Sequence, residues 1–142
     1  MITVKNRLFP WFDCTAMTVW PFVFVRREKE DYYGPVGERH EQIHAHQQLE
    51  VLFITLMTLS VLALHGATPW WSLAVSPFVY FVLYGLEWLV RLAIYRDRDE
   101  AYRNISFEQE AYLHQNDTAY LTERRSLFWL GYLPLKTYHK KK

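Results

Sequence analysis

The sequence has little cysteine, and this narrows the class of protein. Cys14 is the only cysteine among 142 residues, so the chain cannot form an intrachain disulfide or a zinc site built from cysteines. Charges are nearly balanced, with 16 lysines and arginines against 15 aspartates and glutamates, which gives no indication of nucleic acid binding. Residues 1–12 (MITVKNRLFPWF) lack the long apolar core and cleavage site of a signal peptide. At this length we expect a single domain over 1–142.

Formal charge is absent from two long stretches in the middle of the chain. Val51–Leu64 has fourteen residues and Trp70–Leu86 has seventeen. A membrane-spanning helix requires about 20 apolar residues, and the first stretch reaches nineteen over 49–67 if Glu50 and His65 lie near the interfaces. Neither stretch shows a polar face at helical period. We therefore predict a transmembrane hairpin rather than two core helices of a soluble domain.

The residue pattern predicts a mainly α-helical chain with a small N-terminal β element. Residues 17–26 (MTVWPFVFVR) are β-branched and aromatic, which indicates a strand with Pro21 at a bend or an edge. A helix is predicted over 38–67, as the active-site helix and first span, because no glycine or proline interrupts it before Gly66. The second span is predicted over 70–95. Three aromatic side chains of the strand are expected to face the core: Trp20, Phe22 and Phe24.

The rest of the chain is polar again. Glu87 and Arg91 stand four residues apart near the end of the second span and can pair on one helical face. A further helix is predicted over 106–125. Ser106 and Gln109 have the spacing of a capping box at its start.

The distribution of basic residues predicts the topology. The connection 65–72 has no lysine or arginine, whereas 1–48 has six and 96–142 has nine. By the positive-inside rule, both termini lie in the cytoplasm of an integral membrane protein. Trp70 and Trp71 are expected to anchor the hairpin tip at the far interface.

Residues 39–50 (RHEQIHAHQQLE) contain the motif on which we base the expected metal site. His40, Glu41 and His44 form an HExxH pattern on a predicted helix, where residues four apart lie on one face. Both imidazoles can then bind one Zn²⁺, while the glutamate reaches the water on the ion. His46 lies two residues further on and leaves that face.

A third protein ligand is expected from an acidic residue on the same side of the membrane, because a catalytic zinc takes three protein ligands and leaves one position to water. The hairpin returns the chain to that side and delivers FEQEAY (107–112). Glu108 and Glu110 point about 200° apart on a helix, so only one can face the ion. We favour Glu108, since Ala111 one turn on permits close helix packing.

HEQIH, two apolar stretches and a helical Glu-x-x-Ala together resemble the membrane-embedded gluzincins, such as the CAAX prenyl proteases and the heat-shock membrane zinc proteases. The resemblance covers about residues 17–125. It implies a zincin-like fold with a transmembrane helical hairpin between HExxH and the third-ligand helix. It also implies roles for four residues: zinc ligands His40, His44 and Glu108, and general base Glu41.

The chain departs from that family at the residue four after Glu108. The family has an aspartate there that orients a ligating imidazole, and this chain has Tyr112. Asp117 is the substitute that we consider. Residues 17–26 also look like the edge strand that zincins place above the metal to hold an extended substrate.

The expected function is a zinc-dependent membrane metallopeptidase that acts on a peptide or protein substrate, in contact with membrane lipid. An oxyanion donor beside the zinc is required, and the spacing does not choose among His114, Tyr112, Tyr120 and Arg124. The alternatives are a zinc-stabilised membrane protein without activity and a membrane interaction protein. Because the cytoplasmic part of the chain is small, assembly into a dimer and docking on a partner protein both stay open.

Overall fold

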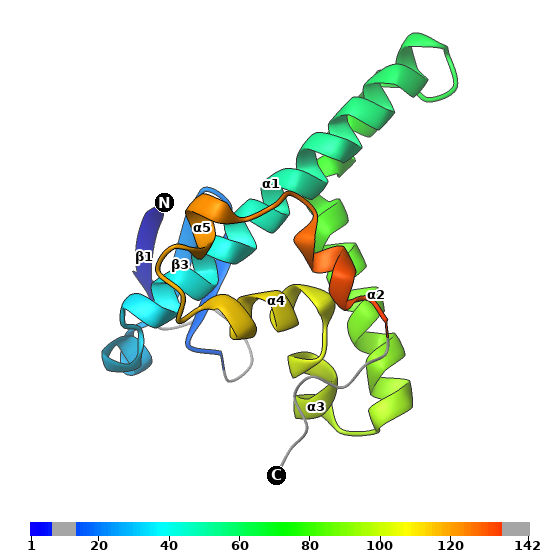
Figure 1. Cartoon of the computed structure of the whole chain (residues 1–142). Coiled ribbons are helices and arrows are strands. Elements are labelled where there is room, and N and C mark those ends of the chain that lie inside the picture. The colour runs from blue at the N-terminus through cyan, green and yellow to red at the C-terminus, as the bar shows by residue number, and fades with distance from the viewer. Residues whose placement is uncertain (7–13, 135–142) are drawn as a thin grey trace.

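A computed structural model describes residues 1–6 and 14–134, and it is mainly helical with a small N-terminal sheet, as predicted (Figure 1). In chain order the elements, with η for 3-10 helices, are β1 (Ile2–Asn6), β2 (Ala16–Val19), β3 (Phe22–Arg26), η1 (Arg27–Tyr32), α1 (Pro35–Leu64), η2 (Trp70–Val75), α2 (Ser76–Tyr95), α3 (Arg98–Arg103), α4 (Ser106–His114), α5 (Tyr120–Glu123) and η3 (Phe128–Tyr132).

The sheet has three strands in the order β1-β3-β2, with β1 parallel and β2 antiparallel to β3. The prediction of one strand over 17–26 was wrong, because the chain reverses at Trp20 and Pro21 and forms the β2–β3 hairpin. Proline lacks the N–H that a continuing strand needs, so the predicted bend at Pro21 is where the strand ends. The parallel partner β1 was not predicted.

The expectation that three aromatic residues of this region face the core was wrong for Trp20 and Phe22, while Phe24 is half-buried. Trp20 is 47% exposed and Phe22 is 39% exposed, whereas Val23 and Val25 are 1% exposed. Thr18 pairs with Val23 across the hairpin and is buried on the same face. These smaller side chains allow the sheet to approach α1 closely, whereas Phe22 and Phe24 alternate with them along β3 and contact each other.

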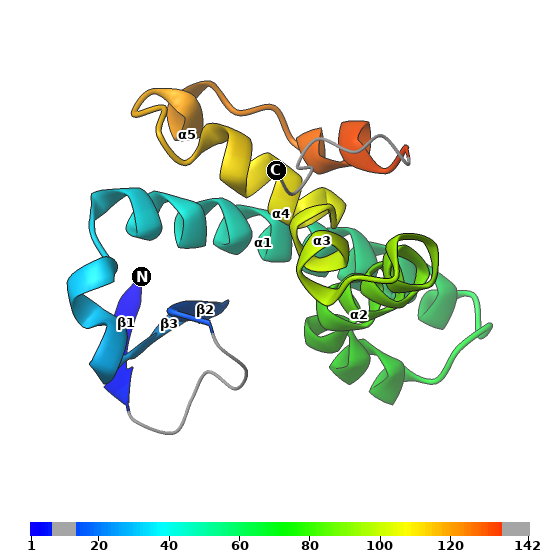
Figure 2. The same ribbon diagram turned by 90° about the horizontal axis from the view of Figure 1, so that it is seen from below.

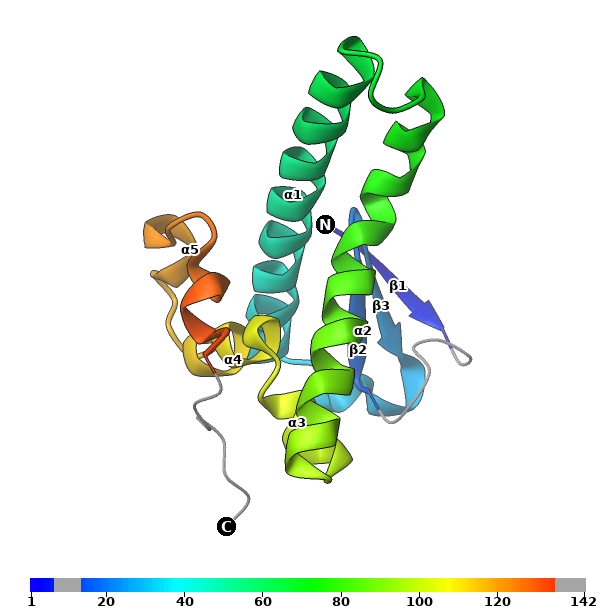
Figure 3. The same ribbon diagram turned by 90° about the vertical axis from the view of Figure 1, so that its right-hand side faces the viewer.

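The helix α1 contains 30 residues and begins three residues earlier than predicted. Pro35 occupies its first turn after Gly34, and proline suits this position because its N–H would have no helical partner. The helix ends at Leu64, and Gly66 follows with φ of +69°, a conformation that glycine adopts without steric cost. α2 returns alongside α1 and completes the hairpin (Figure 3).

The two hairpin helices are long and apolar enough to cross a membrane. The structure contains two such helical stretches among its described residues, Pro35–Leu64 and Trp70–Tyr95. In the most apolar 18-residue stretch of each helix, 22% and 11% of the stretch, respectively, is buried within the protein. The core helix of a soluble protein is mostly buried. Their exposed apolar side chains include Phe53, Ile54, Met57, Val61, Leu62 and Leu64 on α1, and Phe78, Val82, Leu83, Leu86, Leu89, Val90 and Ile94 on α2. The tip of the hairpin projects away from the other elements (Figure 1).

The predicted helix over 106–125 is broken. α4 ends at His114, and α5 begins at Tyr120 after a turn in which the Asp117 carboxylate accepts a hydrogen bond from the Ala119 backbone N–H at 2.9 Å. Asparagine and aspartate side chains offer the backbone such local alternatives to a helix, and Asn116 and Asp117 stand together at the break.

The predicted capping box at the start of α4 was wrong. Ser106 is already helical, and its backbone N–H and hydroxyl donate to the Glu87 carboxylate of α2 at 2.8 and 2.6 Å. Gln109 donates instead to the Asn104 backbone oxygen at 2.6 Å. The predicted pair of Glu87 with Arg91 is confirmed at 2.6 Å, and Arg91 is 1% exposed. The Glu87 carboxylate therefore accepts hydrogen bonds from the start of α4 and also pairs with the buried Arg91.

The helix α1 lies between the sheet and the C-terminal helices, with the sheet on one side and α4 and α5 on the opposite side (Figure 2). Between α1 and the C-terminal helices lies a small apolar cluster of Ile43, Ala111 and Tyr120. A second cluster joins the hairpin to α4 and η3 and contains Val51, Tyr80, Ile105, Phe107 and Trp129. Polar residues of the first turns of α1 are thus enclosed from two sides.

Candidate metal centre

Three potential metal-binding side chains meet where α1 packs against α4. Nε2 of His40 lies 3.3 Å from Oε2 of Glu108, and Nε2 of His44 lies 3.3 Å from Oε1 of the same carboxylate. The two Nε2 atoms are 3.1 Å apart, and all three donor atoms lie within 4.8 Å of one another. The side chains are buried, with Glu108 only 2% exposed. His40, His44 and Glu108 form the only such group among the described residues.

The outer nitrogens of both imidazoles contact amide oxygens. Nδ1 of His40 lies 3.2 Å from Oε1 of Gln115, and Nδ1 of His44 lies 2.8 Å from Oε1 of Gln47. An amide oxygen only accepts, so each Nδ1 donates a proton to it, and Nε2 is the nitrogen that faces Glu108 and the other imidazole. Metal-ligating histidines are usually oriented in this way by a partner on the other nitrogen. The inward-facing nitrogens are therefore prepared to bind a cation.

The Glu108 carboxylate is held at one oxygen and open at the other. Tyr84 of α2 donates its hydroxyl to Oε1 at 2.7 Å, whereas Oε2 is buried and receives no hydrogen bond from the described residues. Burial by itself raises the pKa of Glu108, but the imidazoles of His44 and His40 outweigh it and hold the pKa well below its usual range. An ionised carboxylate beside two imidazole Nε2 atoms is a set of ligands that suits a divalent cation such as Zn²⁺.

The Glu41 side chain is fixed by the sheet. The Thr18 hydroxyl of β2 lies 2.7 Å from Oε2 of Glu41 and 3.1 Å from its backbone oxygen. Gln48, two turns further along α1, donates to the Thr18 backbone oxygen at 2.7 Å. β2 thus runs beside the helix that carries HExxH, and Glu41 is 6% exposed.

The second glutamate of FEQEAY points away from the histidines. Oε1 of Glu110 accepts the Tyr120 hydroxyl at 2.9 Å and also binds Nε of Arg124. Oε2 accepts from Nε2 of Gln47 at 3.1 Å. Arg124 binds Glu50 of α1 as well. The structure therefore brings Glu108, and not Glu110, to the imidazole pair.

Asp117 does not supply the orienting contact that we considered for it. Its carboxylate lies in the exposed turn after α4 and accepts from the Ala119 backbone. The helical break places Gln115 there instead, where its amide oxygen contacts His40. Tyr112, in the place of the family's aspartate, packs its ring edgewise against His40 with the centroids 4.8 Å apart.

The four candidate oxyanion donors differ in position. Tyr120 and Arg124 are bound to Glu110. His114 stacks on Tyr120 and contacts the Tyr132 hydroxyl at 3.1 Å. Of the four, Tyr112 is the one whose ring contacts an imidazole of the centre.

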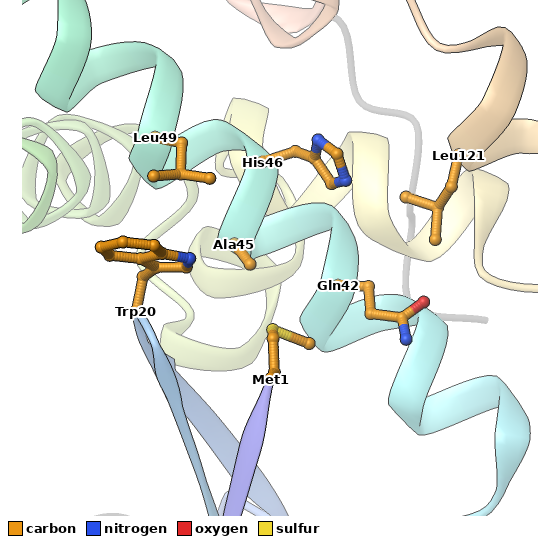
Figure 4. Close-up of a pocket in the computed structure, with 7 residues that line it drawn as sticks. All are labelled: Met1, Trp20, Gln42, Ala45, His46, Leu49 and Leu121. Carbon is orange, nitrogen blue, oxygen red and sulfur yellow. The ribbon is translucent and has the colours of Figure 1, made fainter.

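His46 lies outside the metal centre, as expected for its position on the helix. It lines a shallow pocket of about 150 Å³ between the sheet, α1 and α5 (Figure 4). Trp20 and Met1 extend toward α1 from the sheet in this pocket. Its lining residues are Met1, Trp20, Gln42, Ala45, His46, Leu49 and Leu121, so this hollow is separate from the three clustered donors.

Several residues around the centre were not anticipated from the sequence. Tyr84 and Tyr80 come from α2, and the Tyr80 hydroxyl lies 3.3 Å from Nδ1 of His44. Gln115 and Thr18 come from a turn and a strand. The sequence does contain one pattern that could have predicted the two tyrosines. Tyr80 and Tyr84 are four residues apart in an apolar helix and therefore share one face of α2.

Comparisons with protein-family models, with curated proteins and with solved structures gave no match for this chain. The resemblance to membrane gluzincins therefore stays a prediction that depends on HExxH, the order of the elements and the geometry described above.

Proposed function

We propose that this chain is a membrane zinc metallopeptidase whose site faces the cytoplasm. The observation that supports it most is the convergence of one donor atom each from His40, His44 and Glu108 within 4.8 Å, with Oε2 of Glu108 buried and without a hydrogen-bond donor among the described residues. Three protein donors match a catalytic zinc, which keeps a position free, better than a structural zinc, which takes four.

Zinc bound by these residues would lower the pKa of its water toward neutrality and polarise a peptide carbonyl. Glu41, adjacent to His40 in the motif, would accept a proton from the attacking water and pass it to the leaving amine. The Thr18 hydroxyl donates to the Glu41 carboxylate and holds it in place. The neighbouring strand β2 would bind an extended peptide by backbone hydrogen bonding.

The membrane location is supported by the exposure of the hairpin. Its apolar side chains have no protein partner to bury them over most of α1 and α2 within the described residues. The charged pair Glu87–Arg91 faces inward, where Arg91 is 1% exposed, as expected for charges at membrane depth. The cytoplasmic orientation follows from the positive-inside rule alone.

Metal analysis of the purified chain tests the proposal. We expect stoichiometric zinc in the wild type and loss of that zinc in His44→Ala, because two remaining donors cannot form the centre. His46→Ala is the matched control, since His46 is exposed and lies outside the centre. A wild-type chain without zinc, or equal zinc in both variants, would contradict the proposal.

A non-catalytic zinc protein is the second candidate function, and the burial of the site favours it. His40 is 9% exposed, Glu41 6% and Glu108 2%, so a substrate must find access to an enclosed centre. In that case zinc would raise the thermal stability by fastening α1 to α4, and no peptide in a library would be cleaved.

The Tyr84 hydroxyl is expected to contribute to metal affinity. Tyr84→Phe removes the hydrogen bond that holds Oε1 of Glu108, and loss of such a supporting contact weakens metal binding by about 10- to 100-fold. Zinc competition with a chromophoric chelator measures the change. Tyr95→Phe is the control on the same helix, because the buried Tyr95 hydroxyl has no hydrogen-bond partner in residues 1–6 and 14–134. Equal affinities in the two variants would exclude this role.

A further inference from the structure

The exposed apolar face of α2 continues well beyond the metal centre. Tyr80 and Tyr84 place the centre beside the first half of α2, since their hydroxyls lie 3.3 Å from His44 and 2.7 Å from Glu108. The helix then runs eleven residues further to Tyr95, about 16 Å at 1.5 Å per residue, and passes α4 to reach α3 (Figure 3). The large exposed side chains of this second half are Leu86, Leu89, Val90 and Ile94.

The short helix η3 adds exposed apolar side chains at the level of the second half of α2. Nη2 of Arg91 donates to the Tyr132 backbone oxygen at 3.0 Å. The Trp129 ring packs on Phe107 of α4, with the centroids 4.4 Å apart. The next apolar side chains of this segment are exposed, and they are Leu130 and Leu133. We call the six exposed residues of these two segments the foot residues: Leu86, Leu89, Val90, Ile94, Leu130 and Leu133.

Charged side chains are turned inward along the whole of α2. Glu87 and Arg91 are its only charged residues, their side chains are 14% and 1% exposed, and they pair with each other at 2.6 Å. Hydrocarbon requires this arrangement, because a charge that faces lipid is costly, whereas water does not. Five consecutive charged residues, 96–100, follow directly after the helix. The apolar character of α2 therefore ends at its last turn and not at the level of the metal centre.

The length of α2 matches the thickness of the acyl-chain layer. Its 20 residues extend about 30 Å, and the hydrocarbon core of a bilayer is also about 30 Å thick. If lipid ended at the level of the centre, the second half of α2 would hold its apolar side chains in water. A second protein chain is the other possible cover, but a protein interface in water keeps a polar rim. Every exposed residue of α2 is apolar, so the helix offers no such rim before Arg96.

We propose that the foot residues contact the acyl chains of the membrane, so that lipid reaches the end of α2 and lies against one side of the metal centre. The sheet and the first half of α1 lie on the other side (Figure 2), and they carry the exposed charged residues Lys5, Glu30 and Glu38. The centre thus lies at the boundary between lipid and water, and a peptide reaches it from the side of the sheet. The inference rests on the membrane hairpin of the proposed function and is independent of zinc.

Fluorescent labels on the full chain, reconstituted into phosphatidylcholine vesicles, test the proposal. Cys14→Ser removes the native thiol, and Leu89→Cys or Leu130→Cys then takes a single bimane label. Lipids brominated on their acyl chains quench a bimane that touches them. We expect both labels to lose fluorescence in brominated vesicles compared with unbrominated ones, to an extent similar to a label on Met57→Cys in the apolar part of α1.

Glu38→Cys is the matched control, because Glu38 is exposed at the start of α1 on the side of the sheet. Its label is expected to keep its fluorescence in brominated vesicles. Quenching at Glu38 equal to that at Leu89 would remove the distinction between the two sides and overturn the inference.

The label on Met57 separates this inference from the proposed function. An unquenched label at Leu89 or at Leu130, beside a quenched one at Met57, refutes the contact of the foot residues with lipid and leaves the hairpin in place. Unquenched labels at all three positions refute the membrane hairpin and this inference together.

Oxidation distinguishes a second copy of the chain from lipid. If unlabelled Leu89→Cys chains form disulfide-linked dimers in high yield while the bimane at this position stays unquenched, another copy covers α2 and the proposal is wrong. Should Leu89→Cys not fold, Ile94→Cys takes its place with the same expected results, because Ile94 is 48% exposed near the end of the same helix.

Discussion

Glu41→Gln is expected to abolish peptide hydrolysis by the purified chain while zinc stays bound. The substitution keeps the shape of the side chain and removes the base that would take the proton from water. Because general base catalysis contributes about 10²- to 10⁴-fold, the expected fall in turnover lies in that range. Thr18 and its hydrogen bond to the side chain oxygen are compatible with an amide at this position.

The experiment compares cleavage of a fluorogenic peptide library with the zinc content of the same samples. Glu38→Gln is the control, since Glu38 is exposed in the first turn of the same helix and contacts Gln42. Full turnover by Glu41→Gln would refute the base assignment. Absence of hydrolysis by the zinc-loaded wild type would favour the non-catalytic zinc protein.

Met57→Arg is expected to stop the hairpin from inserting into a membrane. Met57 lies midway along the apolar part of α1 and is 53% exposed. An arginine at the centre of a spanning helix costs about 2.5 to 3.5 kcal/mol, whereas an exposed methionine in a soluble protein can be replaced by arginine with a change of about 0.5 kcal/mol or less.

The fraction of chain that resists alkaline extraction from membranes measures insertion. His46→Arg places the same charge on an exposed position of the same helix, before the apolar part begins, and is expected to extract like the wild type. Equal retention of the two variants, or a wild type that is soluble without detergent, would exclude the transmembrane hairpin.

The helical part of this structure could be predicted because helix signals are local. The apolar stretches, Gly66 and Pro69 define the hairpin. His40 and His44 are four residues apart, and this spacing places them on one face of the helix. The pair Glu87–Arg91 follows the same rule and is confirmed. The strand prediction failed where the chain reverses at Pro21, since β-propensity does not reveal which residues pair.

The centre was less accessible from the sequence, because its partners are distant in the chain. Gln115 is 75 residues from His40, and Tyr84 is 24 residues from Glu108. The choice between Glu108 and Glu110 depends on how α4 is rotated against α1. Arg124 contributes to that rotation because it binds both Glu110 of α4 and Glu50 of α1. No local sequence pattern predicts this contact.

The start of α4 is attached to α2 through Glu87, which binds Ser106 at two points. Tyr84, one turn before Glu87 on α2, holds the Glu108 carboxylate. The helix that carries the acidic donor is thus attached to both hairpin helices, because Gln47 of α1 binds Glu110 and the Phe107 backbone on the same helix. The positions of the three donor atoms therefore depend on how α1 and α2 lie against each other. In the proposed membrane protein, a lipid layer that shifts one of these helices along the other would alter the affinity for the cation.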